Sequence, residues 1–437
     1  MLIHNGWVVT LGEPNQVLFK HSIEVENGLI KRIGPADSFD VSEHEKVLPA
    51  YGRVIMPGFI NAHTHFYSAF ACGYNKGKPA HNFKEVLENL WWRLDRQFGP
   101  DDVVFSGLIA GMDAIRQGCT TLFDHLSSPN YVDGAISQVS EAMREAGLRA
   151  NVCYEVSDRE GLDNALEGIR ENKKNLEREQ DNPLVTNLFG LHASFTLSDE
   201  TLKQVSEIVK AGNYGVHIHV AEDKMDQEHC LKHHGKRVVH RLHDFGLLGP
   251  KTICAHGVWL DESELELLAK TDTILTHQAQ SNQNNGVGQM DLLAAMKAGV
   301  LVGLGTDAMT YNMIHECRSA LFAQRNLTGD PSAGFAEVTQ ALLRNNQRIA
   351  ARFWDNPPGE LAVGRPADVI VMDYDSPTPM NADNFLGHLI FGMHQSTVLH
   401  TVVAGKVLME NRNLFHLYER DYRYDARTLS NRVWNYM

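Results

Sequence analysis

Two histidine pairs, each with one residue between the partners, are the features of this sequence most able to do chemistry. His63 and His65 end an apolar segment that begins at Val54, and His217 and His219 lie in a second apolar segment. If both segments are β-strands, the two members of a pair point to the same face. Two imidazoles on one face can bind one metal ion. Chance spacing is the alternative in a chain with 22 histidines.

Histidine or aspartate also ends most of the other apolar segments. One such residue alone is most simply a core side chain with a satisfied hydrogen bond, but seven segment ends of this kind argue against that explanation. The set comprises His63 with His65, Asp124 with His125, His192, His219, His256, His277 and Asp307. Imidazole and carboxylate groups that converge at one place favour a zinc-type site with an open position for water.

The elements that must position these groups alternate between strand and helix. From Gly58 to about Phe353, eight apolar strand-like segments are each followed by a segment of helical size. Eight such units over about 300 residues predict an α/β fold, the TIM barrel. The predicted strands lie at 59–65, 120–123, 149–152, 188–192, 215–219, 252–256, 273–277 and 300–304. Catalytic groups of such barrels lie at the carboxyl ends of the strands, so the seven segment ends are expected in one mouth.

The two chain ends predict strands only. Residues 6–11 and 22–30 are strand-like, and Asn27-Gly28 indicates a hairpin. Strand-like segments return at 367–372 and 398–408, after Pro357-Pro358-Gly359. We therefore predict a small β-sandwich domain built from residues 1–56 and 359–437, interrupted by a barrel domain at 57–358.

Composition and charge exclude several classes of partner. A net charge of −14 argues against binding to nucleic acid or to anionic membranes. No apolar segment reaches the length of a membrane span, and the N-terminal residues have no basic region followed by a long apolar core. The six cysteines are dispersed without a C-x-x-C pair, which is typical of reduced thiols. We expect a cytoplasmic protein, with a homodimer as the expected assembly.

Two carboxylates are placed for proton transfer. Glu222 follows His219 by three residues, and Asp307 ends the segment Gly303-Leu304-Gly305-Thr306. A bound divalent metal lowers the pKa of water to about 7 and so supplies hydroxide at neutral pH. A base must then take the water proton and an acid must protonate the departing nitrogen, roles that suit Asp307 and Glu222.

The motifs together resemble the amidohydrolase superfamily, in the branch of cytosine deaminases, guanine deaminases and chlorohydrolases. The resemblance rests, in order, on P-G-F-I-N-A-H-T-H at 57–65, H-V-A-E at 219–222, A-H-G at 255–257 and G-T-D at 305–307. It implies one divalent metal per chain, zinc with iron as the alternative, bound by His63, His65, His219 and Asp307. It also implies Glu222 and His256 beside the reacting carbon and His192 at the substrate. The segment 276–282, T-H-Q-A-Q-S-N, departs from the S-H-N-P-x-S-N of relatives.

These observations predict a metal-dependent aminohydrolase that removes ammonia from a small nitrogen heterocycle, purine- or pterin-like by family analogy. Glu222, His256 and Asp307 are the predicted catalytic residues. Trp92, His125, His192 and Asn282 are the predicted substrate contacts. Hydrolysis that opens a cyclic amide is the alternative reaction, and a catalytically silent scaffold is the alternative class.

Three further segments have two interpretations each. Trp91-Trp92-Arg93 favours either a lid that stacks on a planar ring or core packing. His229, His233, His234, His240 and His243 have the composition of a metal cluster, but a solvated or mouth-lining helix is the simpler interpretation. The mixed charges from Arg170 to Glu179 predict a solvated helix face.

Overall fold

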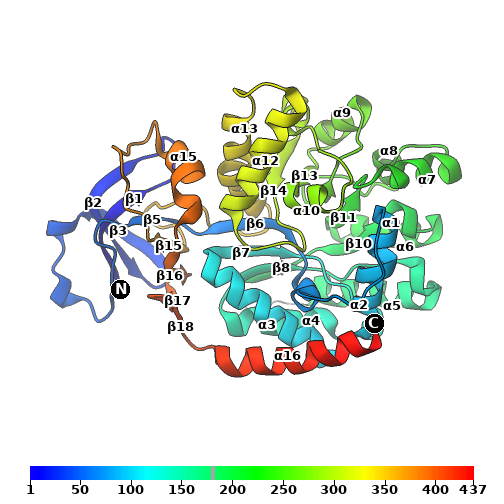
Figure 1. Ribbon diagram of the computed structural model, residues 1–437, viewed down its shortest axis with the longest axis horizontal. Helices are drawn as coiled ribbons and strands as arrows, with labels where there is room; N and C mark the ends of the chain where they lie inside the picture. The colour runs from blue at the N-terminus through cyan, green and yellow to red at the C-terminus, as the bar shows by residue number, and fades with distance from the viewer. Residues whose placement is uncertain (179–182) are drawn as a thin grey trace.

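A ring of parallel strands surrounded by helices forms one part of the molecule, and a sheet from both chain ends forms the other. The computed structural model describes residues 1–178 and 183–437. Figure 1 shows the sheet of the chain ends beside the ring, with the C-terminal helix crossing to the far side of the ring. The α/β fold with a barrel, predicted from the sequence, is confirmed.

The ring contains the eight predicted strands and one short additional strand. Their bounds are β6 Phe59–Thr64, β7 Cys119–Asp124, β8 Arg149–Val152, β9 Val185–Asn187, β10 Phe189–Ala193, β11 Val216–Val220, β12 Ile253–His256, β13 Ile274–His277 and β14 Leu301–Leu304. Continuous ladders join β6-β7-β8-β9 and β10-β11-β12-β13-β14, all parallel. Neighbours in sequence are thus neighbours in space, as in a (β/α)8 barrel.

Two isolated parallel bridges bring the edges of these sheets together. Thr64 pairs with Asp307, and Val156 pairs with Leu191. The Asp307 amide donates to the carbonyl oxygen of His63 at 3.0 Å. A Cβ atom on Gly305 would lie 2.6 Å from the His63 backbone nitrogen, so only glycine permits this approach. The closure of the ring therefore places the first and last predicted ligands side by side.

The helices lie outside the ring. They are α1 Phe83–Val86, α2 Trp92–Leu94, α3 Pro100–Gln117, α4 Ala135–Ala146, α5 Leu162–Glu177, α6 Asp199–Gly212, α7 Lys224–His234, α8 Val238–Asp244, α9 Glu262–Lys270, α10 Ala279–Asn284, α11 Leu292–Lys297, α12 Met313–Thr328, α13 Phe335–Gln340 and α14 Asn346–Ala350, with α15 Phe385–Gly387 and α16 Glu419–Tyr436 towards the C-terminus. Most of the charge run that begins at Arg170 lies in α5, where Glu171 is buried rather than solvated. Glu179, at the end of that run, lies outside the described residues.

Both chain ends contribute to a single sheet of nine strands. These are β1 Leu2–Val9, β2 Val17–Glu26, β3 Leu29–Pro35, β4 Val47–Pro49, β5 Val54–Pro57, β15 Val369–Met372, β16 Val398–Val403, β17 Lys406–Glu410 and β18 Asn413–Leu414. The predicted hairpin is present, with Asn27 and Gly28 at φ 52° and 79°. β5 pairs with β1 and β15 and continues through Gly58 into β6. The domain boundaries at 56/57 and 358/359 stay a prediction.

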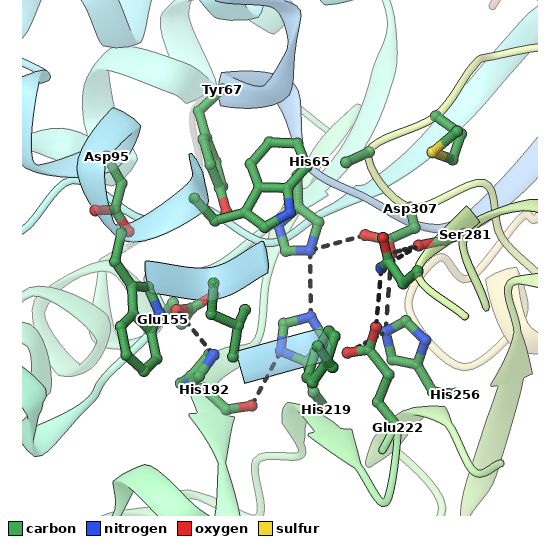
Figure 2. A pocket seen from close by; sticks show the side chains of 17 residues that line it. His65, Tyr67, Asp95, Glu155, His192, His219, Glu222, His256, Ser281 and Asp307 are labelled. Atoms are coloured by element: carbon green, nitrogen blue, oxygen red, sulfur yellow. Dashed lines mark hydrogen bonds and ion pairs between the residues drawn. The ribbon is translucent and has the colours of Figure 1, made fainter. Parts of the chain in front are cut away.

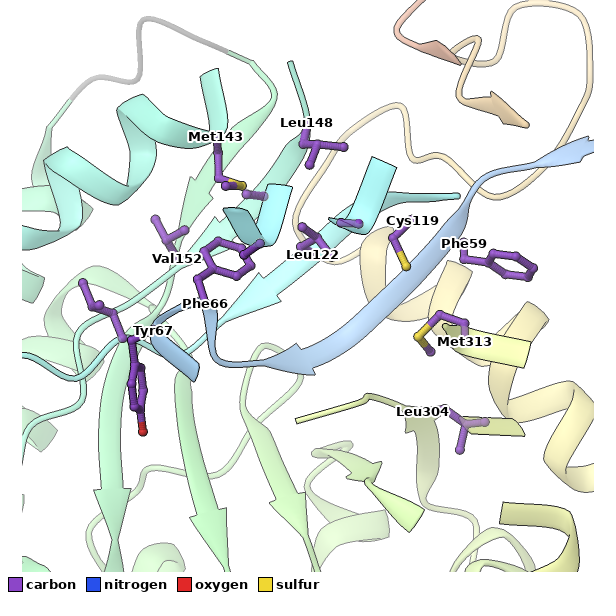
Figure 3. Packing of buried hydrophobic residues seen from close by; sticks show 14 of the residues in the cluster. Phe59, Phe66, Tyr67, Cys119, Leu122, Met143, Leu148, Val152, Leu304 and Met313 are labelled. Carbon is purple, nitrogen blue, oxygen red and sulfur yellow. The ribbon is translucent and has the colours of Figure 1, made fainter. Parts of the chain in front are cut away.

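Two buried apolar layers stabilise the barrel. The first layer contains Ile60, Phe123, Ile253, Ile274 and Trp354. In this layer, residues from opposite sides of the ring are in contact inside the barrel. The other packs the strands against the surrounding helices, and Figure 3 shows part of it around β6 and β7. The strands that carry polar residues at their ends are thus fixed by apolar contacts on both faces.

The C-terminal helix α16 is an element that the sequence motifs do not predict. It lies along α3, where Arg423 pairs with Asp113 at 2.7 Å. Near its end, the indole nitrogen of Trp434 donates to the carbonyl oxygen of Phe70 at 2.7 Å. The chain terminus therefore packs against the segment that follows His65. No helix in the described part of the chain is long and apolar enough to cross a membrane.

Candidate active site

A pocket at the carboxyl ends of the barrel strands gathers most of the predicted site residues. Figure 2 shows His65 and His219 near its centre, Asp307, His256 and Glu222 on one side, and Glu155 with His192 on the other. The lining residues are His65, Tyr67, Phe83, Leu87, Trp91, Trp92, Asp95, Glu155, His192, His219, Glu222, His256, Ser281, Asn285, Asp307, Ala308 and Met309. Five of the seven predicted strand ends thus converge in one pocket, whereas the buried Asp124-His125 and His277 do not line it.

Three histidines each have one ring nitrogen held by a neighbour and the other directed at a common point. The Nδ1 atom of His65 lies 2.6 Å from the carbonyl oxygen of His125, and that of His219 lies 3.1 Å from the carbonyl oxygen of His192. The Nδ1 atom of His63 lies 2.8 Å from His217 Nε2. Such outer contacts fix the ring orientation and leave Nε2 as the ligand atom.

The free nitrogens fit a cation. Because a carbonyl oxygen only accepts hydrogen bonds, His65 and His219 carry hydrogen on Nδ1, and in the neutral ring Nε2 is then a lone pair. The two Nε2 atoms face each other at 3.2 Å, and the buried Nε2 of His63 has no hydrogen-bond partner in the described chain. Lone pairs in contact repel each other unless a positive charge lies between them. This donor set, three imidazoles with one carboxylate, suits a divalent metal.

Asp307 completes the set. Its Oδ1 atom lies 3.1 Å from His65 Nε2 and 3.6 Å from His63 Nε2, while Oδ2 accepts from the Ser281 hydroxyl at 2.5 Å. Burial alone raises the pKa of Asp307, but the adjacent imidazoles of His63 and His65 hold it well below its usual range. Asp307 is therefore an ionised carboxylate, the form that binds metal.

Strained backbone aims the catalytic side chains. Ala221, His256 and Asp307 have φ of 48°, 75° and 55°, a left-handed conformation that is uncommon for residues other than glycine. Ala221 directly follows β11, His256 ends β12, and Asp307 lies three residues past the end of β14. Strain of this kind persists where the surrounding structure enforces it, and it is common at active sites.

His256 and Glu222 form a proton-transfer pair beside Asp307. His256 Nδ1 lies 2.9 Å from Asn282 Oδ1, so that its Nε2 faces the pocket, 3.5 Å from Glu222 Oε2 and 3.9 Å from Asp307 Oδ2. Burial, together with the charge of Asp307, raises the pKa of Glu222 well above its usual range. The raised pKa favours the protonated form of Glu222, the form that a general acid needs.

The four predicted substrate contacts divide into two pairs. Trp92 and His192 line the pocket, with ring centroids 6.2 Å apart, and Trp91 lines it as well. His125 and Asn282 are fully buried outside the lining. The ring nitrogens of His125 contact Glu155 and two backbone carbonyls, and Asn282 contacts His256. The geometry therefore makes His125 and Asn282 supports of pocket residues.

Sequence reasoning missed the acidic wall opposite Asp307. Glu155 and Asp95 line the pocket and are 6% and 1% exposed. Burial raises the pKa of Glu155, but His192, His125 and Arg159 outweigh it and lower the pKa to about 2. Glu155 follows β8 by three residues, so the rule that polar residues end the barrel strands could have found it. Asp95 lies in the segment after β6, where no comparable rule applies.

The histidines of α7 lie outside this pocket. His229, His233 and His234 line a separate surface hollow, and Trp92 lines both this hollow and the pocket. Within the described ranges, no cluster of three metal-ligating side chains includes any of them. The simpler interpretation, a partly solvated helix near the mouth, agrees with this placement.

Comparisons with known proteins place the chain in a family. The model of the amidohydrolase family matches residues 54–408. A 5-methylthioadenosine/S-adenosylhomocysteine deaminase of Thermococcus sibiricus is 32% identical, with 94% of each chain covered. A 5'-deoxyadenosine deaminase of Methanosarcina acetivorans is 28% identical over 98% of this chain and 97% of its own.

A solved structure agrees on the fold. An adenosine deaminase from Xanthomonas campestris with bound zinc superposes with a TM-score of 0.85 at 24% identity, covering 99% of this chain and 98% of its own. The matched residues 54–408 include every ligand and acid-base residue described above. The chain belongs to the amidohydrolase family and is a hydrolase that acts on carbon–nitrogen bonds other than peptide bonds.

Proposed function

We propose that the protein is a metal-dependent deaminase that replaces an exocyclic amine of a small, purine- or pterin-like heterocycle with oxygen. The observation that carries this proposal is the placement of the Glu222 carboxyl, whose pKa is raised by burial, 3.5 Å from His256 and next to the predicted metal ligand Asp307. An acid next to a Lewis-acid site is what amine displacement requires. Deaminase relatives of similar length support the same reaction.

The residues of the chain divide the reaction between them. His63, His65, His219 and Asp307 would hold the metal, which when bound lowers the pKa of water and polarises the reacting centre. Asp307 and the Nε2 atom of His256 orient the water and accept its proton. Glu222 gives its proton to the ring nitrogen beside the reacting carbon. Trp91 and Trp92 provide aromatic faces for a planar ring.

The balance of the reaction distinguishes it from ring opening. The water oxygen bonds to the ring carbon, the exocyclic carbon–nitrogen bond breaks, and the amine leaves as ammonia. The product keeps its ring and differs from the substrate by about one mass unit. Hydrolysis of a cyclic amide instead adds one whole water and releases no ammonia.

Coupled ammonia detection with mass spectrometry of the product tests the proposal. The compounds are purines, 5'-modified adenosines, pterins and pyrimidines, each assayed with zinc-loaded and iron-loaded protein. We expect one ammonia per ring product for at least one class, and no release by Glu222→Gln. A product that gains one water without ammonia would identify a ring-opening amidase instead.

A further inference from the structure

The wall of the pocket opposite Glu222 contains two hydrogen-bond acceptors that lack a donor. Glu155 Oε2 lies 3.1 Å from His125 Nδ1, whereas Glu155 Oε1 has no hydrogen-bond partner among the described residues. His192 Nε2 lies 3.9 Å from Oε1, too far for a hydrogen bond. Figure 2 shows both side chains directed into the pocket.

The Nε2 atom of His192 is itself an acceptor. The Thr196 hydroxyl donates to the carbonyl oxygen of Ala193 at 3.1 Å, so it accepts from His192 Nδ1, 2.6 Å away. His192 thus carries its hydrogen on Nδ1 and exposes Nε2 to the pocket. A neutral imidazole in this tautomer presents a lone pair to the pocket beside the ionised carboxylate of Glu155.

The surrounding charges do not supply the missing donor. Arg159 lies close by, but its guanidinium pairs with Asp95 and packs 5.4 Å from the ring of Trp92, and its unpartnered Nη1 forms no hydrogen bond or ion pair with Glu155 in the described chain. His125 is committed to Glu155 Oε2 and to the carbonyl oxygens of Leu191 and His217. A ligand that binds here must therefore bring its own hydrogen-bond donor.

The position of Glu155 fixes where on the substrate that donor lies. One carboxylate oxygen of Glu155 lies within 4.8 Å of ring nitrogens of His65, His125 and His219, a group that could itself hold a metal ion. The reacting carbon must lie next to His65 and His219. The donor therefore belongs to the ring that reacts, on the opposite flank of the reacting carbon from the nitrogen that Glu222 protonates, and not to a distant substituent such as a ribose.

Building on the proposed deaminase function, we propose that Glu155 and His192 select cyclic guanidines, the 2-amino-4-oxopyrimidine rings of guanine and pterins. In such a ring, the carbon that bears the amine lies between one nitrogen with a lone pair and one nitrogen with hydrogen. The first faces Glu222 and the second donates to the gap between Glu155 and His192.

Adenine-type rings match this wall poorly. Their amine-bearing carbon has a lone-pair nitrogen on one flank and a carbon on the other, beyond which the next nitrogen is again an acceptor. An acceptor that meets Glu155 is repelled, and the carboxylate stays without a donor. Selection by such unpaired groups is typically stronger than selection by shape.

The test compares matched substrates in wild type and in Glu155→Gln. Wild type should deaminate guanine or 2-amino-4-oxopteridine with at least 10-fold higher kcat/KM than adenine or adenosine. Glu155→Gln should lose roughly 10- to 100-fold on the first pair, the usual effect of losing a charged hydrogen bond, and little on the second. Metal content should not change. Glu171→Gln, an equally buried carboxylate away from the pocket, is the control and should keep the wild-type ratio.

A binding measurement separates this inference from the proposed function. In the Glu222→Gln background, calorimetry with guanine and with adenine reports selection without turnover, and adding Glu155→Gln should abolish the preference for guanine. That result supports the selection even if no ammonia is ever released. A preference for adenine-type compounds, or an equal loss on both classes in Glu155→Gln, overturns the inference and leaves the deaminase proposal intact.

Discussion

The two ends of the pocket both contain polar atoms without partners, but the atoms differ in what they lack. At the end formed by His63, His65 and His219, each ring has one nitrogen anchored and one lone pair directed at a shared point. At the end formed by Glu155 and His192, two acceptors face a gap of 3.9 Å. The first end lacks a cation and the second lacks a hydrogen-bond donor.

Because of this difference, the imidazoles at one end suit metal binding, and the imidazole and carboxylate at the other end suit substrate binding. Converging lone pairs at hydrogen-bond distance from a carboxylate make a metal centre. No candidate metal group in the described chain joins Glu155 to His192, and these two acceptors leave room for an N–H group of a substrate. A histidine at a strand end is therefore not diagnostic of metal binding. Its hydrogen-bond partner decides which ring nitrogen faces the pocket and whether that nitrogen carries a hydrogen or a lone pair.

Removing a ligand from the metal end should have the largest effect. In His219→Ala the point shared by three imidazoles loses one of them, and His65 Nε2 loses the facing nitrogen at 3.2 Å. We expect metal content to fall from about one ion to a small fraction of an ion per chain, with activity lost in proportion. Elemental analysis of the purified variant measures this. Glu155→Gln is the comparison from the other end, and metal loss of equal size there would mean that the two ends are one site.

Glu222→Gln should separate binding from chemistry. Glu222 contacts His256 and Asn285 rather than the three imidazoles, so the metal should stay. Turnover should fall roughly 100- to 10,000-fold, the range for a positioned acid or base. Steady-state kinetics and elemental analysis of the same Glu222→Gln sample measure the turnover and the metal content. Near wild-type turnover would remove Glu222 from the reaction.

Asn282→Ala distinguishes a support from a substrate contact. Because Asn282 is fully buried and 2.9 Å from His256 Nδ1, its loss should free the imidazole to rotate. We expect kcat to fall about 10- to 100-fold, the range for outer partners of site residues, while KM changes little. The reverse pattern, a raised KM with kcat retained, would restore Asn282 as a substrate contact.

The smallest effect concerns His277, a strand-end histidine that belongs to neither end. It is fully buried, both ring nitrogens lack a partner in the described chain, and burial lowers its pKa to about 3. The folded pKa lies below the unfolded value of about 6.5, so stability is full above pH 6.5 and declines as pH falls towards 3. At pH 5 this one group should cost about 2 kcal/mol.

Urea unfolding of metal-free protein at pH 7.5 and pH 5 measures the contribution of His277. The free energy of unfolding should fall between pH 7.5 and pH 5, and in His277→Asn this fall should be smaller by about 2 kcal/mol. Other buried histidines contribute equally to both proteins, so the difference isolates one residue. An unchanged pH dependence would show that His277 is protonated in the folded state.

The sequence predicted the metal end far better than the recognition end. Strand alternation and the shared edge of parallel strands predict that His63, His65, His219 and Asp307 lie close together, whereas their role as metal ligands is what the family resemblance implies. Glu155 obeys the same rule but was overlooked, whereas the role of Asn282 depends on how α10 packs against His256. The helix α16 is stabilised by long-range pairs such as Arg423 with Asp113, which no local pattern reveals.

The passage of β5 directly into β6 has a consequence for biosynthesis. β5 leaves the ribosome with the first two ligands close behind it, but its partner β15 follows about 300 residues later. During that interval one edge of the N-terminal sheet has no strand to pair with, the condition in which strands pair wrongly. The last ligand also arrives late, so metal cannot be captured early in synthesis. We expect slow maturation, with non-local pairing rather than helix formation setting its rate.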